Sequence, residues 1–101
     1  MSHPSNGLDD VVHQRARLGI LAILDEAGRA DFAYLRDNLS LTDGNLARHL
    51  ETLEQADLVR IAKRFEERKP RTWISATPKG RTAFRSEIAA LKAIVARAER
   101  R

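Results

Sequence analysis

The chain has no cysteine among its 101 residues, which excludes thiol catalysis, a disulfide framework and cysteine-based metal or redox sensing. It also has no apolar run near the roughly 20 residues of a membrane-spanning helix, and its N-terminus lacks the basic and apolar pattern of a secretory signal. We therefore expect a cytoplasmic protein. At this length we expect one domain with a small core, which a subunit interface would help to stabilise.

Sequence motifs for catalysis are also lacking. There is no Gly-rich phosphate loop, no H-E-x-x-H pair and no G-x-S-x-G elbow. His3, His13 and His49 are scattered and form no ligand set at helical spacing. We expect no enzyme activity, no cofactor and no metal site. The alternative is a metal sensor assembled across a dimer interface, for which His13 near Asp9 and Asp10 is the candidate.

Charge is present but unevenly distributed. Residues 1–59 carry 5 basic and 10 acidic side chains, residues 60–81 carry 8 and 2, and residues 82–101 carry 5 and 2. The net charge of +4 therefore combines an acidic first half with a strongly basic middle. A basic block in a folded region attracts phosphate. The alternative is an ordinary solvated surface.

Apolar spacing and capping residues predict the first two helices. Residues 1–7 show no apolar periodicity, so we expect a disordered leader there. A helix is predicted from Leu8 to about Ala27, with Asp9 and Asp10 in its first turn and apolar residues on two sides. Gly28 should end it, Ala30 could form a brief strand, and Asp31 should cap a short helix over residues 32–39.

The rest of the chain predicts a helix, a hairpin and a last helix. Thr42 should cap a helix over residues 43–56, giving a helix-turn-helix with the preceding one. Partial alternation predicts a strand over residues 58–65, a polar tip over 66–70 and a returning strand over 72–74, with Phe65 and Trp73 packed on the helices. Thr77 and Pro78 should open the last helix.

The predicted helix after Thr42 has two different faces. Leu46, Leu50 and Leu53 share the apolar face. The opposite face carries Asn45, Arg48, His49 and Thr52, which suit base edges and phosphates. Gly44 in the first turn would let backbone N–H groups approach a phosphate. The alternative is the solvated face that any amphipathic helix has.

Fourteen residues of this region carry a resemblance to a known family. Leu41 to Glu54 reads LTDGNLARHLETLE, which resembles the L-T-x-G-N-L-x-x-H-L-x-x-L-E pattern of bacterial and archaeal winged helix-turn-helix transcriptional regulators related to the MarR and ArsR groups. The basic hairpin and the segment from Thr77 to Arg81 are also similar, and the likeness covers roughly residues 8–96. It implies an α+β, mainly helical fold with a two- or three-stranded antiparallel wing and long terminal helices.

The resemblance also implies the contacts with double-stranded DNA. A recognition helix would enter the major groove and the wing would touch the backbone or minor groove. The residues implied are Thr42, Asn45, Arg48 and His49 on the helix, with Arg64, Arg68, Lys69 and Arg71 on the wing. Glu66 and Glu67 depart from an all-basic wing, so the tip itself could lie off the DNA.

The last predicted helix indicates a subunit interface. Phe84, Ile88, Leu91, Val95 and Ala98 follow the four-three spacing of a helix that packs along another helix. The alternative is that this stripe covers its own core. We favour a homodimer in which the first and last helices meet, as in similar regulators. The residues expected at this interface are Val12, Ile20, Ile88, Leu91, Val95 and Ala98.

Together these features predict one winged helix domain over residues 8–101 that includes a C-terminal dimerisation helix. The predicted function is a transcriptional regulator that binds duplex DNA sequence-specifically as a homodimer. The alternative is a winged helix module that binds protein and reads no DNA. No residue pattern in the sequence identifies an operator, a regulated gene, the sign of regulation or a small-molecule effector.

Overall fold

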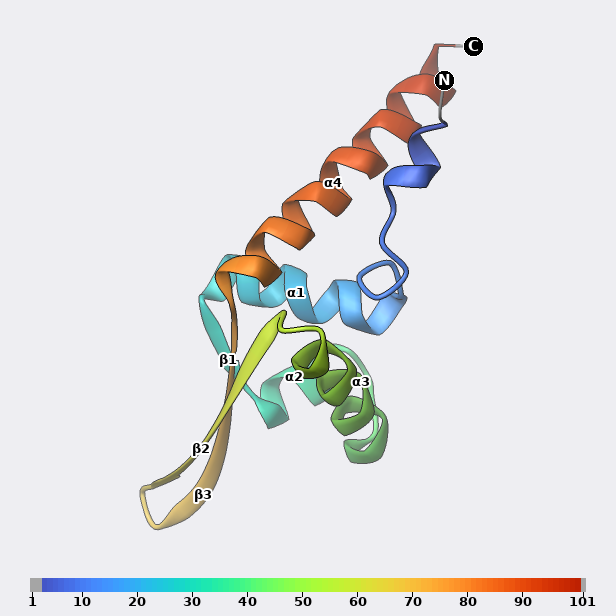
Figure 1. The fold of residues 1–101 in the computed structure, drawn as a ribbon. Coiled ribbons are helices and arrows are strands. Elements are labelled where there is room, and N and C mark those ends of the chain that lie inside the picture. The colour runs from blue at the N-terminus through green and yellow to red at the C-terminus, as the bar shows by residue number, and fades with distance from the viewer. Residues whose placement is uncertain (1–2, 101) are drawn as a thin grey trace.

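The fold combines helices with a three-stranded antiparallel sheet, as the sequence predicts (Figure 1). A computed structural model describes residues 3–100. The elements in chain order are a 3-10 helix η1 (Pro4–Gly7), α1 (Arg15–Ala27), β1 (Arg29–Asp31), α2 (Phe32–Asn38), α3 (Asp43–Gln55), β2 (Val59–Glu66), β3 (Lys69–Ala76) and α4 (Pro78–Glu99). No helix within residues 3–100 is both long enough and apolar enough to cross a membrane.

Helix α1 begins at Arg15, so the prediction of a helix from Leu8 is wrong. Gln14 caps the helix by accepting the N–H of Arg17 at 3.0 Å. Asp9 lies upstream in a turn, where its Oδ1 accepts the N–H groups of Val11 and Val12 at 2.8 and 3.4 Å. A short acidic side chain that binds nearby backbone N–H groups competes with helix formation. This local competition delays the helix by two turns.

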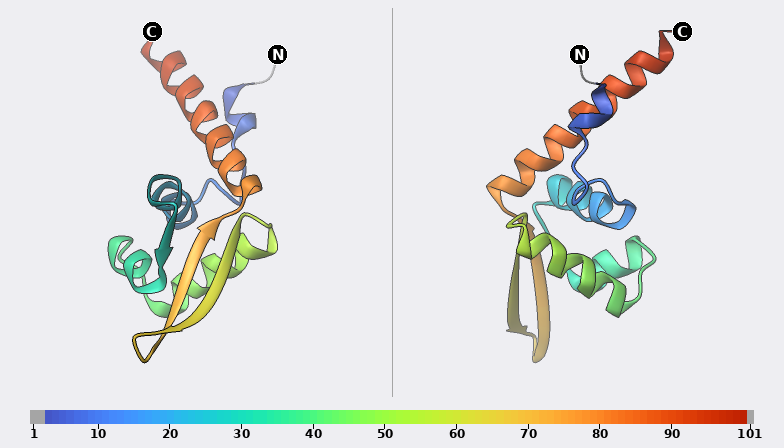
Figure 2. Two further views of the ribbon diagram at one scale, coloured as in Figure 1. Left: turned by 90° about the vertical axis from the view of Figure 1, so that its left-hand side faces the viewer. Right: turned by 45° about the vertical axis from the view of Figure 1, so that its right-hand side comes forward.

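The N-terminal segment is ordered where the structure describes it. Pro4–Gly7 form the 3-10 helix η1, although the sequence predicts a disordered leader over residues 1–7; residues 1 and 2 lie outside the described part. His3 Nδ1 accepts the N–H of Ser5 at 3.1 Å and so caps the turn. A Cβ built on Gly7 would lie 3.4 Å from Cβ of Ala90, so this segment packs along α4 (Figure 2).

The predicted helix caps are confirmed. Asp31 accepts the N–H of Tyr34 at 2.8 Å and starts α2, and Thr42 accepts the N–H of Asn45 at 3.1 Å and starts α3. Gly28 ends α1 with φ 83°, a left-handed conformation that glycine adopts without strain. These caps fix the short turn between α2 and α3.

The sheet has the order β1-β3-β2, and β2 and β3 form a long hairpin. Glu66 pairs with Lys69, so the turn contains only Glu67 and Arg68, with φ 50° and 66°. Positive φ at both turn residues matches the right-handed twist of the strands, but Asn and Gly are the usual residues there. The hairpin projects beyond the helices (Figure 1).

The core lies between the helices and one face of the sheet. It centres on Leu21, Leu35, Leu46 and Ile74, each at most 1% exposed. Val12 and Ile20 belong to this core and are 0% exposed. Their prediction as dimer-interface residues is therefore wrong, because neither side chain has surface left to give to a partner.

Helix α4 starts in the core and then leaves it. Thr77 accepts the N–H of Gly80 at 2.9 Å, and Pro78 occupies the first helical turn, as predicted. A Cβ on Gly80 would lie 2.0 Å from the carbonyl oxygen of Leu58, so only glycine lets the helix start so close to the backbone just before β2. The C-terminal half of α4 extends away from the body (Figure 2).

Candidate nucleic-acid interface

Helix α3 turns its leucines into the core and its polar side chains outward. Leu46, Leu50 and Leu53 are at most 3% exposed. Asn45 and Arg48 are exposed, while His49 and Thr52 are half-buried. The structure therefore brings the polar residues predicted for this helix onto one surface.

Asn45 and Arg48 form a linked pair on this surface. Arg48 Nη2 donates to Asn45 Oδ1 at 3.3 Å, which leaves the Asn45 amide N–H groups available as donors. Arg48 has no carboxylate within salt-bridge distance among residues 3–100. Thr52 is less available, since its hydroxyl donates to the Arg48 carbonyl at 3.2 Å.

The start of α3 is open to an anion. A Cβ built on Gly44 would meet nothing within 4 Å, so packing inside the protein does not require glycine there. The unpaired N–H groups of the first helical turn carry a partial positive charge. Asp43 would oppose an anion, but its carboxylate pairs with Arg36 Nη1 at 3.0 Å.

His49 differs from its neighbours because a cation lies against its ring. Arg17 Nη1 lies 3.3 Å from His49 Nδ1. Burial lowers the pKa of His49 below its usual value, and the charges of Arg17, Arg48 and Arg15 lower it further. His49 is therefore a neutral imidazole at neutral pH.

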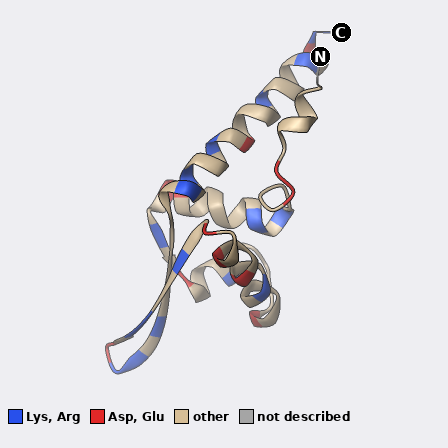
Figure 3. Ribbon diagram, in the orientation of Figure 1, with Lys and Arg blue, Asp and Glu red and all other residues tan. Residues whose placement is uncertain are grey.

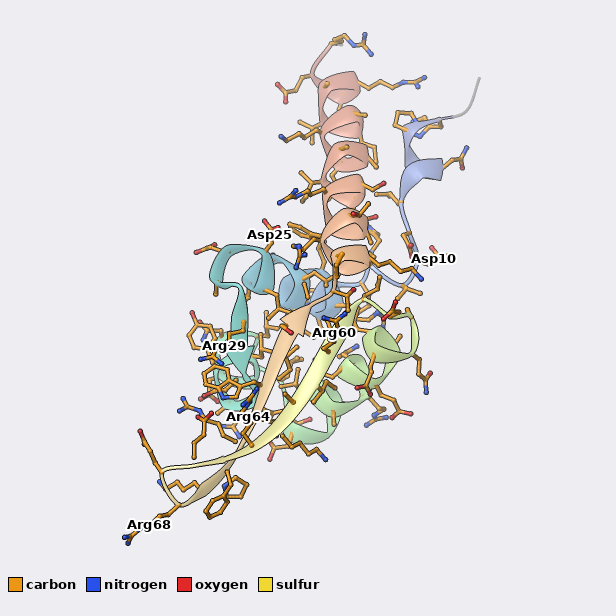
Figure 4. All side chains as sticks on the ribbon, turned by 60° about the vertical axis from the view of Figure 1, so that its left-hand side comes forward. Asp10, Asp25, Arg29, Arg60, Arg64 and Arg68 are labelled. Atoms are coloured by element: carbon orange, nitrogen blue, oxygen red, sulfur yellow. The ribbon has the colours of Figure 1, made fainter. Side chains whose placement is uncertain are left out.

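The register of the hairpin separates its basic residues into two faces. Lys63 and Phe65 alternate with Arg64 along β2, and they continue the face on which Val59 is buried. Arg64 lies opposite Arg71 on the other face. Figure 3 shows basic residues along both strands of the hairpin, and Figure 4 shows Arg68 at its far end.

Arg71 is held by partners within the protein. Its Nη2 and Nε donate to Asp31 Oδ2 at 2.8 and 3.1 Å. Its guanidinium lies 4.7 Å from the centroid of the Trp73 ring, and that of Arg29 lies 4.1 Å from it. The N–H of Tyr34 and the guanidinium of Arg71 lower the pKa of Asp31. The two groups therefore both stay ionised, and the Asp31 carboxylate offsets the charge of Arg71.

Phe65 of the hairpin does not pack on the helices as predicted. Phe65 is 75% exposed, because the hairpin carries it beyond the helices. Trp73 lies against the two arginines, and its Nε1 donates to Glu66 Oε1 at 3.2 Å. Side-chain alternation predicts on which face of β2 Phe65 lies, but it does not predict whether the helices extend far enough to cover that side chain.

A match to a family model covers residues 16–95, and its description is the winged helix DNA-binding domain. The chain belongs to this family. The uncharacterised protein MJ0432 of Methanocaldococcus jannaschii is 42% identical over 72 residues, which are 71% of this chain and 78% of that protein. The family and the fold are those of transcriptional regulators, so the predicted resemblance is confirmed.

Solved structures share the fold of this winged helix domain. A transcriptional regulator homologue from Pyrococcus horikoshii is 30% identical, with a TM-score of 0.85 over 94% of this chain and 95% of that chain. The Mycobacterium tuberculosis regulator MosR, solved in complex with DNA, is 19% identical, with a TM-score of 0.72 over 94% of this chain and 68% of that one. A MarR-family regulator from Silicibacter pomeroyi is 22% identical, with a TM-score of 0.69 over 95% of this chain and 64% of that one.

By their positions in the winged helix fold, α3 corresponds to the recognition helix and the β2–β3 hairpin to the wing. Arg68 and Lys69 lie exposed at the wing turn. Lys63 and Arg17 are not among the predicted site residues. Counting in twos from Val59 would have placed Lys63 on the helix-facing side, but no local pattern connects Arg17 to His49.

The predicted interface residues of α4 lie on one exposed apolar face. Ile88 and Leu91 are half-buried, Val95 is 53% exposed and Ala98 is exposed. A shallow groove on this helix is lined by Ile88, Leu91, Lys92, Val95, Ala96 and Glu99. The N-terminal end of the stripe, at Phe84, packs in the core of its own subunit.

No metal site is evident in the described part of the chain. Within residues 3–100 no group of three or more His, Asp or Glu side chains could hold a metal ion. His13 instead pairs through Nδ1 with Glu87 Oε2 at 2.7 Å, and Glu87 Oε1 accepts the N–H of Asp9 at 2.9 Å. These contacts attach the N-terminal segment to α4.

Proposed function

We propose that this protein is a transcriptional regulator that binds double-stranded DNA sequence-specifically as a homodimer. The recognition helix α3 enters the major groove and the wing follows the backbone or enters the minor groove. The observation that carries the proposal is the exposed pair of Asn45 and Arg48, which lack acidic partners and lie on the helix beside a basic wing. Asn pairs well with adenine and Arg with guanine.

Other residues of the surface serve phosphates in this arrangement. Thr42 and Gly44 are exposed at the start of α3. The cations of the wing are Lys63, Arg64, Arg68 and Lys69. Arg71 contributes less because Asp31 already offsets its charge. Phe65, exposed beside Lys63, would lie against sugar or base edges, a contact that minor-groove proteins make with apolar side chains.

The apolar face of α4 supplies the dimer contact. Val95 would otherwise remain exposed, and a symmetric pair of α4 helices would cover it. The two recognition helices of such a dimer would meet half-sites about one helical turn apart, roughly 34 Å. The bound site would then be pseudo-palindromic.

Selection of bound duplexes from a random library tests DNA recognition and symmetry together. We expect one palindromic site, with affinity falling steeply as salt rises because phosphate contacts release counterions. Lys63→Ala and Arg68→Ala should each reduce the salt slope by about 1, with Arg71→Ala changing it less. Failure to bind any duplex at low salt would refute the proposal.

A protein-binding role is less well supported by this surface. A helix that docks on a protein presents large apolar side chains. Among residues 3–100, the large hydrophobic side chains that are exposed are Tyr34, Phe65 and Val95, and none of them lies on α3.

A further inference from the structure

The guanidinium of Arg17 on α1 is fixed between the N-terminal segment and the recognition helix. Its Nε donates to the carbonyl of Val11 at 2.6 Å, and its Nη2 donates to the carbonyl of Asp10 at 3.4 Å. Its Nη1 lies 3.3 Å from His49 Nδ1. Arg17 is half-buried, so these contacts hold it in one orientation.

This contact decides which nitrogen of His49 carries the proton. An arginine side chain donates hydrogen bonds and cannot accept one, so His49 Nδ1 must be the acceptor. The neutral ring then carries its hydrogen on Nε2. Nε2 has no partner among residues 3–100 and is not a buried unsatisfied atom, so it is open to a ligand.

We propose that Arg17 is a positioning residue that holds His49 as a neutral imidazole and so offers its Nε2–H to an acceptor on DNA. The acceptor is a purine N7 or a phosphate oxygen, and proteins that bind duplex DNA contact both kinds of atom. The inference rests on the proposed function and adds a specific donor to it. Arg17 itself is directed at the protein and touches no DNA.

The charges around the His49 ring favour its neutral form. Arg15 and Arg17 on α1 and Arg48 on α3 face His49, and together with burial they lower its pKa. Protonation would turn Nδ1 into a donor and break the contact with Arg17. The contact with Arg17 should therefore be lost only as pH falls through the lowered pKa of His49.

Nitrogen NMR of the histidine-labelled full chain tests the tautomer without DNA. We expect Nδ1 of His49 to be unprotonated and Nε2 to be protonated at pH 7, with the signal assigned by its loss in His49→Ala. Arg17→Gln should give a mixture of tautomers. A protonated Nδ1 in the wild-type protein would overturn the inference, whether or not DNA binds.

A double-mutant cycle on the selected duplex tests the consequence for binding. Arg17→Gln and His49→Ala should each weaken binding about 2- to 10-fold, and the double variant should be no weaker than His49→Ala alone. Arg17→Lys keeps the charge but not the planar fork, so it should behave like Arg17→Gln. Arg85→Gln, at an exposed position of α4, is the matched control, and melting temperatures confirm that each variant folds.

The double-mutant cycle can also contradict the role of Arg17 as a positioning residue. If Arg17→Gln still weakens binding in the His49→Ala background and lowers the salt slope, Arg17 contacts phosphate itself and the inference fails, while the proposed function stands. If the wild-type protein binds no duplex, the proposed function fails and the NMR measurement still decides the tautomer.

Modified DNA identifies the acceptor. The contribution of His49 should vanish with 7-deazapurine at one position if the acceptor is N7, and with a neutral methylphosphonate at one linkage if it is a phosphate oxygen. Insensitivity to every such substitution would overturn the inference.

Discussion

At the residue scale, Arg48 is the cation on α3 to which the proposed function assigns contact with a base. No carboxylate among residues 3–100 lies within salt-bridge distance of Arg48. Its guanidinium donates a hydrogen bond to Asn45 Oδ1. Arg48→Ala should cost about 1 to 3 kcal/mol of binding free energy and relax specificity at one base pair. Competition binding to single-base variants of the selected site measures this, with Arg85→Ala as the matched control. An equal loss on every sequence would make Arg48 a phosphate contact instead.

Asp31 has two separable roles, as the cap of α2 and as the partner of Arg71. Its pKa is lowered by the Tyr34 N–H and by Arg71, so the stability it adds is present above its usual pKa of 3.8 and is lost as pH falls through the lowered value. Asp31→Asn keeps the cap but loses the charge. We expect the melting temperature of Asp31→Asn to fall less steeply than that of the wild type as pH drops from 7 to 2. Asp31→Ala also loses the cap, so it should be less stable than Asp31→Asn at every pH. Parallel wild-type and Asn curves would contradict the lowered pKa.

At the element scale, the wing turn combines an unfavourable backbone with an unfavourable charge. Glu67 has φ 50° without being Asn or Gly, which costs about 1 kcal/mol, and its carboxylate opposes phosphate. Glu67→Asn should raise the stability by up to about 1 kcal/mol, because Asn tolerates this conformation. Glu67→Gln removes the charge alone, so it should strengthen DNA binding without raising the melting temperature. Equal melting temperatures for the two variants would contradict the strain.

The elements also show what the sequence can and cannot predict. Caps such as Thr42 and the apolar face of α3 depend on neighbours within four residues, so local rules place them. The start of α1 depends on a competing turn at Asp9, and helical periodicity does not register that competition. The pairing of Arg71 with Asp31 joins residues 40 apart in the chain, which only the β1–β3 register brings together. Burial of Val12 and Ile20 likewise requires the packed helices.

At the scale of the whole molecule, the two ends of the structure divide the proposed work. The wing and α3 lie at one end and the exposed half of α4 at the other (Figure 1), and the molecule extends 57 × 24 × 21 Å. An interface through α4 would therefore leave both recognition surfaces uncovered. Dimerisation can then set the spacing of half-sites without contributing a DNA contact.

This separation predicts a variant that loses the dimer and keeps the fold. Val95 is 53% exposed in the α4 groove, so Val95→Asp should place two like charges at the interface while leaving the core intact. We expect a monomer by sedimentation, an unchanged melting temperature at low protein concentration, and weak binding to one half-site. Ala93→Asp adds the same charge on the opposite side of α4, outside the groove residues, and should remain a dimer. If Val95→Asp still binds the full palindrome as a dimer, another surface joins the subunits, since one buried carboxylate pair without partners costs several kcal/mol.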